Sequence, residues 1–157
     1  PLIKVDVSQI LAHVGDNQPF SQVVDAAAIG ETSPWFGGDI TVSGEIVNLG
    51  NAFRFNARIT GQASLECGRC LAVFEQPIDF SLEEELEPEE IDPVSGLVDI
   101  AETIRTALIF HEPMQPLCNE ECKGLCFHCG ADRNQQECKC GQKAIDPRLA
   151  GLSRLLE

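Results

Sequence analysis

Residues 53–67 read FRFNARITGQASLEC, and this stretch decides the kind of fold that the chain can form. Apolar side chains alternate with polar ones from Phe53 to Ile59, and the same phase resumes after Gly61 and continues to Cys67. A period of two places successive side chains on opposite faces of a β-strand. The stretch therefore predicts one long strand with a single buried face, which the glycine allows to bend.

The segments on either side of this strand predict an antiparallel meander. Residues 39–47 alternate in the same way, and residues 48–51 (NLGN) supply a turn. Downstream, Cys67-x2-Cys70 stands where a hairpin should reverse, and a second long strand follows with Ile78, Phe80 and Leu82 on one face. Residues 2–7 (LIKVDV) predict a further strand, whereas residues 15–38, rich in Gly, Pro and small side chains, are expected to be irregular.

Helical periodicity replaces the alternation in residues 97–110. One helix face carries the apolar residues Ile100, Ile104, Ala107 and Leu108. Asp99 with Glu102 predicts a capping box, and Pro113 ends the segment. We expect this helix to pack its apolar stripe on the sheet. In residues 146–157, Asp-Pro followed by spaced leucines predicts a short terminal helix.

These patterns together predict an α+β fold. It consists of an antiparallel β-meander sheet with a packed helix, plus a C-terminal cysteine-rich zinc module and a short terminal helix. We expect an acidic β-rich domain over residues 1–112 and the cysteine-rich module with its helix over residues 113–157. No apolar run approaches a membrane span and no signal peptide begins the chain, so we expect a cytoplasmic protein. Thiols stay reduced in that compartment, which favours metal binding over disulfides.

All eight cysteines occur in short-spaced pairs, namely Cys67-x2-Cys70, Cys118-x3-Cys122, Cys126-x2-Cys129 and Cys138-x-Cys140. Zinc prefers four thiolates in a tetrahedron, and two ligands a few residues apart can share one ion. The sequence therefore predicts two structural zinc sites. We assign the last four cysteines to one site and the first four to another, which ties the hairpin tip to the C-terminal module. The spacing also permits other pairings of the four arms.

The cysteine pattern argues against catalysis. Eight thiolates in two sites leave no coordination position for water or substrate. The sequence contains no phosphate-binding loop, nucleophile elbow or Ser/His/Asp context, so we expect a protein that is not an enzyme and has no small-molecule substrate. The alternative is a thiol-redox or iron–sulfur protein that uses the CxxC pair and the C-terminal cluster, since both chemistries also rely on thiolates.

The formal net charge is −14, and it is concentrated in the first part of the chain. Residues 1–117 carry nineteen acids against five Lys or Arg, whereas residues 118–157 carry six of each. This acidity disfavours binding to phosphates and favours a basic protein partner, with the run EEELEPEEID at 83–92 as a candidate docking segment. A purely solubilising role is the alternative. Contacts to a partner or to RNA are expected from Arg69, Lys123, Arg133, Lys139, Lys143 and Arg148.

Several ordered motifs resemble one known family. Over residues 40–157 the chain carries LECGRCL, LVDIAETIRTALIFHEPMQPLC, CKGLCFHCGADRN and DPRLAGLSRLL. This combination resembles the YceD family, the large-ribosomal-RNA-subunit accumulation proteins of bacteria and plastids. The resemblance implies a role in 23S ribosomal RNA accumulation and large-subunit assembly, through a ribosomal protein, an assembly factor or the RNA. It carries over to Arg69 and the eight cysteines. Some relatives lack the C-terminal cluster, which implies that the core role does not require the second metal site.

Overall fold

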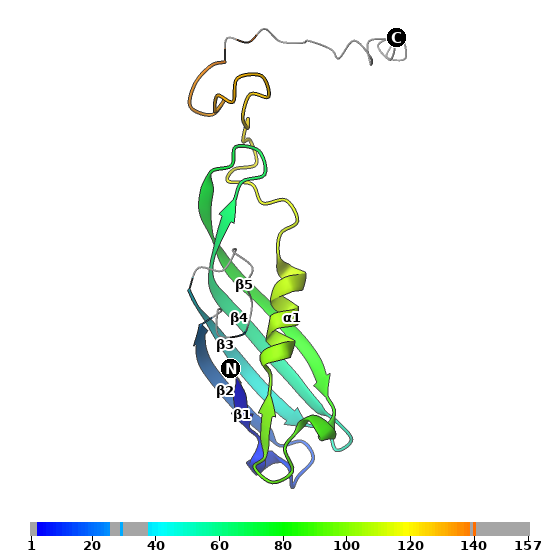
Figure 1. The fold of residues 1–157 in the computed structure, drawn as a ribbon. Coiled ribbons are helices and arrows are strands. Elements are labelled where there is room, and N and C mark those ends of the chain that lie inside the picture. Colours follow the sequence, from blue (N-terminus) through cyan, green and yellow to red (C-terminus); the bar gives the residue numbers. More distant parts are fainter. Residues whose placement is uncertain (1–2, 26–28, 30–37, 139, 141–157) are drawn as a thin grey trace, which may run out of the picture.

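This computed structural model describes residues 3–25, 29, 38–138 and 140. In chain order they form β1 (Lys4–Asp6), the 3-10 turn η1 (Ser8–Ile10), β2 (Asn17–Asp25), β3 (Asp39–Asn48), β4 (Phe53–Glu66), β5 (Val73–Leu86), the 3-10 turn η3 (Pro88–Glu90), β6 (Leu97–Asp99) and α1 (Ala101–His111). The strands form two antiparallel sheets, one of β1 and β6 and one of four strands in the order β2-β3-β4-β5 (Figure 1). The terminal helix predicted over residues 146–157 lies outside the described residues.

The four-stranded sheet is a meander, as predicted from residue 39 onward. Each of its strands is antiparallel to the next strand in the chain. The expectation that residues 15–38 are irregular is wrong for residues 17–25, which form the edge strand β2. Its hydrophobic alternation is weak because Gln18 and Gln22 occupy positions on the inward face. Pro19 lies within it, which an edge strand tolerates because one side of its backbone needs no ladder partner.

The small sheet and the helix form a second layer against one face of the large sheet (Figure 1). Because β6 pairs with β1, α1 begins at Ala101 and not at residue 97. The predicted capping box is wrong. Oδ1 of Asp99 accepts a hydrogen bond from the main-chain nitrogen of Ala101 at 3.0 Å, but the Glu102 side chain lies 3.4 Å from Arg105 instead of returning to the helix start.

The hydrophobic core lies between these two layers. Alternate side chains of β3 and β4 meet apolar residues of β1, β6 and α1 in one continuous cluster. Phe55 is fully buried and stacks on Phe20, with 5.6 Å between the ring centroids. Ile104 and Leu108, four residues apart on α1, are also fully buried, so the helix packs its apolar stripe on the sheet as predicted.

The hairpin of β4 and β5 extends beyond the rest of the sheet. The last residue of β4 that pairs with β3 is Thr60, whereas β4 and β5 stay paired as far as Glu66 and Val73. We call residues 61–66 with residues 73–78 the arm. Figure 1 shows the arm projecting toward the loops that follow α1. A two-stranded ribbon is marginally stable by itself, so the end of the arm requires another source of stability.

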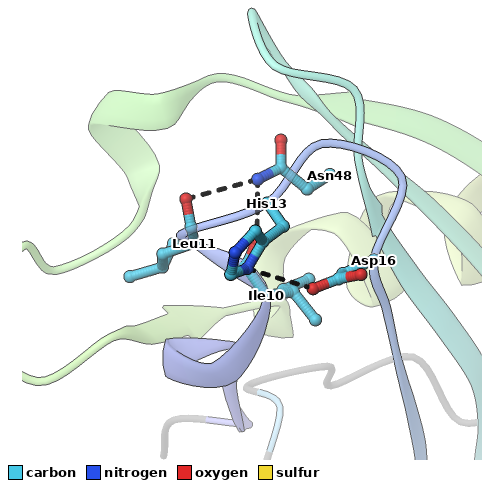
Figure 2. A network of polar contacts seen from close by, with 5 residues as sticks. All are labelled: Ile10, Leu11, His13, Asp16 and Asn48. Carbon is cyan, nitrogen blue, oxygen red and sulfur yellow. Dashed lines mark hydrogen bonds and ion pairs between the residues drawn. The ribbon is translucent and has the colours of Figure 1, made fainter.

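Asn48, at the end of β3, is a buried polar residue that fixes η1 and the following loop to the sheet. Its Nδ2 donates hydrogen bonds to the carbonyl oxygens of Ile10 at 2.7 Å and Leu11 at 3.4 Å, as Figure 2 shows. Its Oδ1 accepts from the main-chain nitrogen of Gly50 at 2.7 Å. One amide therefore closes the β3–β4 turn and satisfies the end of η1.

Replacing this amide is expected to destabilise the fold. Asn48→Ala leaves a buried main-chain acceptor without its donor, a change that typically costs about 1–3 kcal/mol. We expect that loss in the free energy of unfolding by urea. Asn51→Ala, at an exposed position in the same turn, serves as the matched control and is expected to change stability by less than about 0.5 kcal/mol. Equal stabilities for the two variants would contradict the role of Asn48.

Candidate metal centres

Four cysteines gather at the end of the arm, and we call them the proximal cluster. Their sulfur atoms all lie within 4.8 Å of one another, and the members are Cys67, Cys70, Cys118 and Cys122. The Sγ atoms of Cys67 and Cys122 are 3.8 Å apart, and those of Cys70 and Cys118 are 3.6 Å apart. The long hairpin supplies two ligands and the segment after α1 supplies the other two.

Main-chain hydrogen bonds position the residues of the proximal cluster. The nitrogen of Leu71 donates to the carbonyl of Cys67 at 2.9 Å, and Leu71 takes a left-handed conformation with φ of 60° to close the reversal. The nitrogen of Gly68 donates to the carbonyl of Pro116 at 2.9 Å, which ties the tip of the arm to the incoming segment. A turn, in which the Cys122 nitrogen donates to the Asn119 carbonyl oxygen at 3.0 Å, brings the second cysteine pair together.

The other four cysteines form a second group, the distal cluster, consisting of Cys126, Cys129, Cys138 and Cys140. The Sγ of Cys138 lies 3.2 Å from that of Cys126 and 3.6 Å from that of Cys129. Gly130 adopts a φ of +71°, and its nitrogen donates to the carbonyl of Cys126 at 2.8 Å. A glycine at this position lets the knuckle turn without steric strain. These two groups contain the same cysteines as the two sites assigned from the sequence.

The two clusters differ in burial. In the proximal cluster Cys67, Cys70 and Cys122 are buried, and Phe74, Leu117 and Leu125 pack against them. In the distal cluster only Cys126 is buried, while the others are exposed or half-buried. The proximal cluster thus belongs to a small apolar core, and the distal cluster lies closer to solvent.

Main-chain amides favour a thiolate in each cluster. The pKa of Cys67 is lowered to about 6, chiefly by the main-chain hydrogen bond from Cys118. The pKa of Cys126 is likewise lowered to about 6, chiefly by the main-chain hydrogen bond from Cys129. Amide N–H groups directed at sulfur stabilise the anion that binds metal.

Crowding raises the pKa of another thiol in each cluster. Hydrogen bonding with Cys70 is the largest cause that raises the pKa of Cys118 to about 12, and hydrogen bonding with Cys138 does the same for Cys140. Several thiols so close together cannot all ionise without a positive charge among them. A divalent cation provides that charge, so the donor set and its electrostatics fit a metal ion in each cluster.

The separation of the sulfur atoms also fits a single tetrahedral ion. Four sulfurs, each about 2.3 Å from zinc, lie about 3.8 Å from one another. Four of the sulfur pairs are 3.2 to 3.8 Å apart, near that value, and all sulfurs of a cluster lie within 4.8 Å of one another. A cluster of several irons holds its cysteines further apart, because irons and inorganic sulfides lie between them. Both sets of four cysteines can therefore hold one metal ion each.

Two side chains support the proximal cluster, and the spacing of the cysteines did not identify either role. The guanidinium of Arg69 donates to the carbonyl oxygens of Glu120 at 3.1 Å and Cys122 at 3.0 Å. The Nδ2 of Asn134, on the loop inside the distal cluster, donates to the Sγ of Cys122 at 3.3 Å. The Oδ1 of Asn134 accepts from the main-chain nitrogen of Lys123 at 2.8 Å. The loop of the distal cluster that carries Asn134 thereby supports Cys122 of the proximal cluster.

The charged residues expected to contact a partner have different surroundings. Arg69 is exposed, yet its guanidinium is engaged within the chain as described. Lys123 and Arg133 are exposed on the loops around the clusters. Lys139, Lys143 and Arg148 lie outside the described residues. Partner contact by any of these side chains stays a prediction.

Two comparisons with known proteins find matches with closely similar descriptions. The family model described as "Large ribosomal RNA subunit accumulation protein YceD" matches residues 55–156. A protein of Arabidopsis thaliana, described as "Large ribosomal RNA subunit accumulation protein YCED homolog 1, chloroplastic", is 33% identical over 60 residues. That alignment covers 38% of this chain and 19% of the relative, so the chain spans about a fifth of the relative's length. No solved structure matches the chain.

Proposed function

Because this chain belongs to the YceD family of large ribosomal RNA subunit accumulation proteins, we propose that it supports the accumulation of 23S ribosomal RNA and the assembly of the large ribosomal subunit. The observation that carries this proposal is the family match over residues 55–156, which includes all eight cysteines. The names of the family and of the chloroplast relative both refer to large-subunit ribosomal RNA.

The metal in both clusters is zinc in this proposal. Four thiolates at tetrahedral separation form the usual structural zinc site, in which protein fills every coordination position. The ion would neutralise the crowded thiolates and hold loops together. Two tightly bound zinc ions per chain in a colourless protein are expected from elemental analysis. A coloured protein containing iron and sulfide would contradict this and support the iron–sulfur alternative.

Binding, and not catalysis, is the proposed mode of action. Each set of four cysteines would close its coordination sphere, which leaves no position for a reacting water molecule. The acidic β-rich domain would engage a basic ribosomal protein or assembly factor, and the neutral cysteine-rich module would contact ribosomal RNA through Lys123 and Arg133. No helix among the described residues has the length and apolar character needed to cross a membrane. The cytoplasm is the proposed compartment, since it keeps thiols reduced.

Asn134 provides a test of metal binding that leaves every ligand in place. Asn134→Ala removes the hydrogen bond to the Cys122 sulfur, and loss of such an outer-shell partner typically weakens metal affinity about 10–100-fold. We expect that loss at the proximal cluster in a competition titration with a chromophoric chelator. Gln136→Ala, at an exposed position on the same loop, is the control and should bind as wild type does. Equal affinities for both variants would exclude a supporting role for Asn134.

The cellular role is tested by deleting the gene in its own host. We expect a lower ratio of 23S to 16S ribosomal RNA, restored by a tagged wild-type copy. In a sucrose gradient the tagged protein is expected to sediment with immature large-subunit particles or to remain with a free ribosomal protein. An unchanged ribosomal RNA ratio after deletion would contradict the proposed function.

A further inference from the structure

The four-stranded sheet has a second face that the core does not use, and we call it the open face. It consists of the side chains that alternate with the core residues on β2, β3, β4 and β5. Every residue on this face is exposed or half-buried, whereas the opposite face of β3 and β4 carries buried residues such as Val42, Ile46, Phe55 and Ile59. The open face is therefore a broad surface that the described part of the chain leaves to solvent.

The open face carries many more acidic than basic residues. It carries the acids Asp25, Asp39, Glu45, Glu66, Glu75, Asp79, Glu83 and Glu85. Its basic residues are Arg54 and Arg58, and both are already paired within the face. Arg58 binds Asp79 through two hydrogen bonds of 2.7 and 2.6 Å, and Arg54 lies 3.5 Å from Glu83. Acids therefore outnumber basic residues eight to two on the described strands of this face, and both arginines are already engaged.

The shape of the open face admits a ligand close to the backbone. A shallow depression of about 700 Å³ crosses the sheet, and its lining includes Ser43, Glu45, Asn56, Arg58 and Glu83. Gly44 contributes only main chain to this surface, because the register places position 44 opposite Phe20 and Ala57 on the core side. Short hydroxyl side chains such as Thr41, Thr60 and Ser81 extend this low surface.

The charge and the side chains of the open face do not favour the binding of RNA. Sheets that bind single-stranded RNA stack bases on exposed aromatic rings and neutralise phosphates with basic side chains. The phenylalanines of the four strands, Phe20, Phe53, Phe55, Phe74 and Phe80, all occupy positions on the core face. A face with such an excess of acids would repel phosphate. The chemistry of the surface therefore matches a cationic polypeptide.

We propose that the open face docks a segment rich in lysine and arginine from a basic protein, lying across the depression. The inference rests on the proposed function, in which the acidic domain engages a basic partner, and it assigns that contact to a particular surface. It also differs from the sequence-based expectation of docking by residues 83–92. Within that run only Glu83 and Glu85 face the partner, because Glu84 stands opposite Phe55 on the other side of the strand.

The alternation of β5 supplies a matched control for this proposal. One variant carries Glu45→Gln, Glu75→Gln and Glu85→Gln, all on the open face. The control carries Glu84→Gln, Glu89→Gln and Glu112→Gln, three exposed acids elsewhere. Both variants lose three negative charges, so net charge and its long-range attraction are equal. Circular dichroism and thermal unfolding establish that both remain folded.

The probe is a labelled twenty-residue peptide of alternating lysine and serine, titrated by fluorescence anisotropy at low and physiological salt. We expect the open-face variant to bind about tenfold more weakly than wild type and the control to bind within about twofold of it. Amide chemical shifts should change on β2 to β5. A twenty-nucleotide single-stranded RNA should neither bind the open face nor compete. Equal losses in the two variants, or RNA binding at this face, would overturn the proposal.

The same variants separate this inference from the proposed function. In the deletion host, the control variant is expected to restore the 23S ratio fully and the open-face variant only in part. Full rescue by both would reject the docking surface while the role in ribosomal RNA accumulation stands. An unchanged ratio in the deletion host itself would instead reject the proposed function, and the peptide titration would still decide whether the face binds a basic segment.

Discussion

Removal of the two proposed zinc ions by a chelator is expected to unfold the end of the arm and residues 113–138 while the four-stranded sheet stays folded. Over residues 112–138, the described segment after α1 consists of turns and irregular loops with one isolated bridge, between Leu125 and Asp132. Their apolar contacts form a small cluster, separate from the main core, whose buried members are themselves cysteines. Structural zinc contributes about 10–16 kcal/mol in isolated zinc peptides, far more than so few contacts can replace.

Hydrogen exchange followed by mass spectrometry measures this outcome region by region. Amides of residues 67–72 and 113–138 should lose protection on chelation and regain it when zinc is returned, whereas β3 and β4 should keep theirs. Cys67→Ser is expected to reproduce the loss in both regions, because it opens the proximal cluster. Cys129→Ser should affect mainly residues 126–138. Unfolding of the sheet at the same chelator concentration, or no change anywhere, would contradict the division into a self-sufficient core and a metal-dependent module.

Phe55→Ala is expected to cost about 3–5 kcal/mol of unfolding free energy, the usual range for a phenylalanine removed from a core. The side chain is fully buried and stacks on Phe20. Its loss leaves a cavity between the two layers, which β4 cannot close by moving inward because it pairs along its whole length with β5. Domains of this size have total stabilities of about 5–15 kcal/mol, so the variant should be severely weakened.

Phe110→Ala is the matched control, because Phe110 is 82% exposed near the end of α1. Its removal is expected to change stability by less than about 0.5 kcal/mol. Urea unfolding of the zinc-loaded proteins, followed by circular dichroism, compares the two directly. Similar midpoints for both variants would mean that the core is not organised around Phe55.

Much of the architecture was predictable where one physical signal dominates. The long strand from Phe53 has a buried face that only Gly61 interrupts, and the helix with Ile104 and Leu108 has a clear stripe, so periodicity alone located both. The short spacings identified the four cysteine pairs but permitted other pairings of them, and the grouping into two sets of four was one choice among these. By contrast, β2 was missed because its inward positions include glutamines and its stability comes from pairing with β3.

The features that were not predictable depend on tertiary contacts. Asp99 with Glu102 has the spacing of a capping box, but β6 pairs with β1 immediately before the helix and the glutamate turns to Arg105 instead. Asn134 and Arg69 support the metal centres from loops whose conformation no local pattern fixes. The open face became visible only once the register assigned alternate residues of four strands to one surface.

The length of the arm has a mechanical consequence. Strands rise about 3.3 Å per residue, so six residue pairs carry the cysteine-bearing end roughly 20 Å past the last contact with β3. In the proposed function the hairpin would be a spacer between the acidic domain and the cysteine-rich module, which are the two proposed attachment points. A partner particle that presents complementary sites at that distance would gain from bivalent attachment, and one with a different spacing would not. The protein would then select a stage of assembly by measuring a length, even where each contact alone is weak.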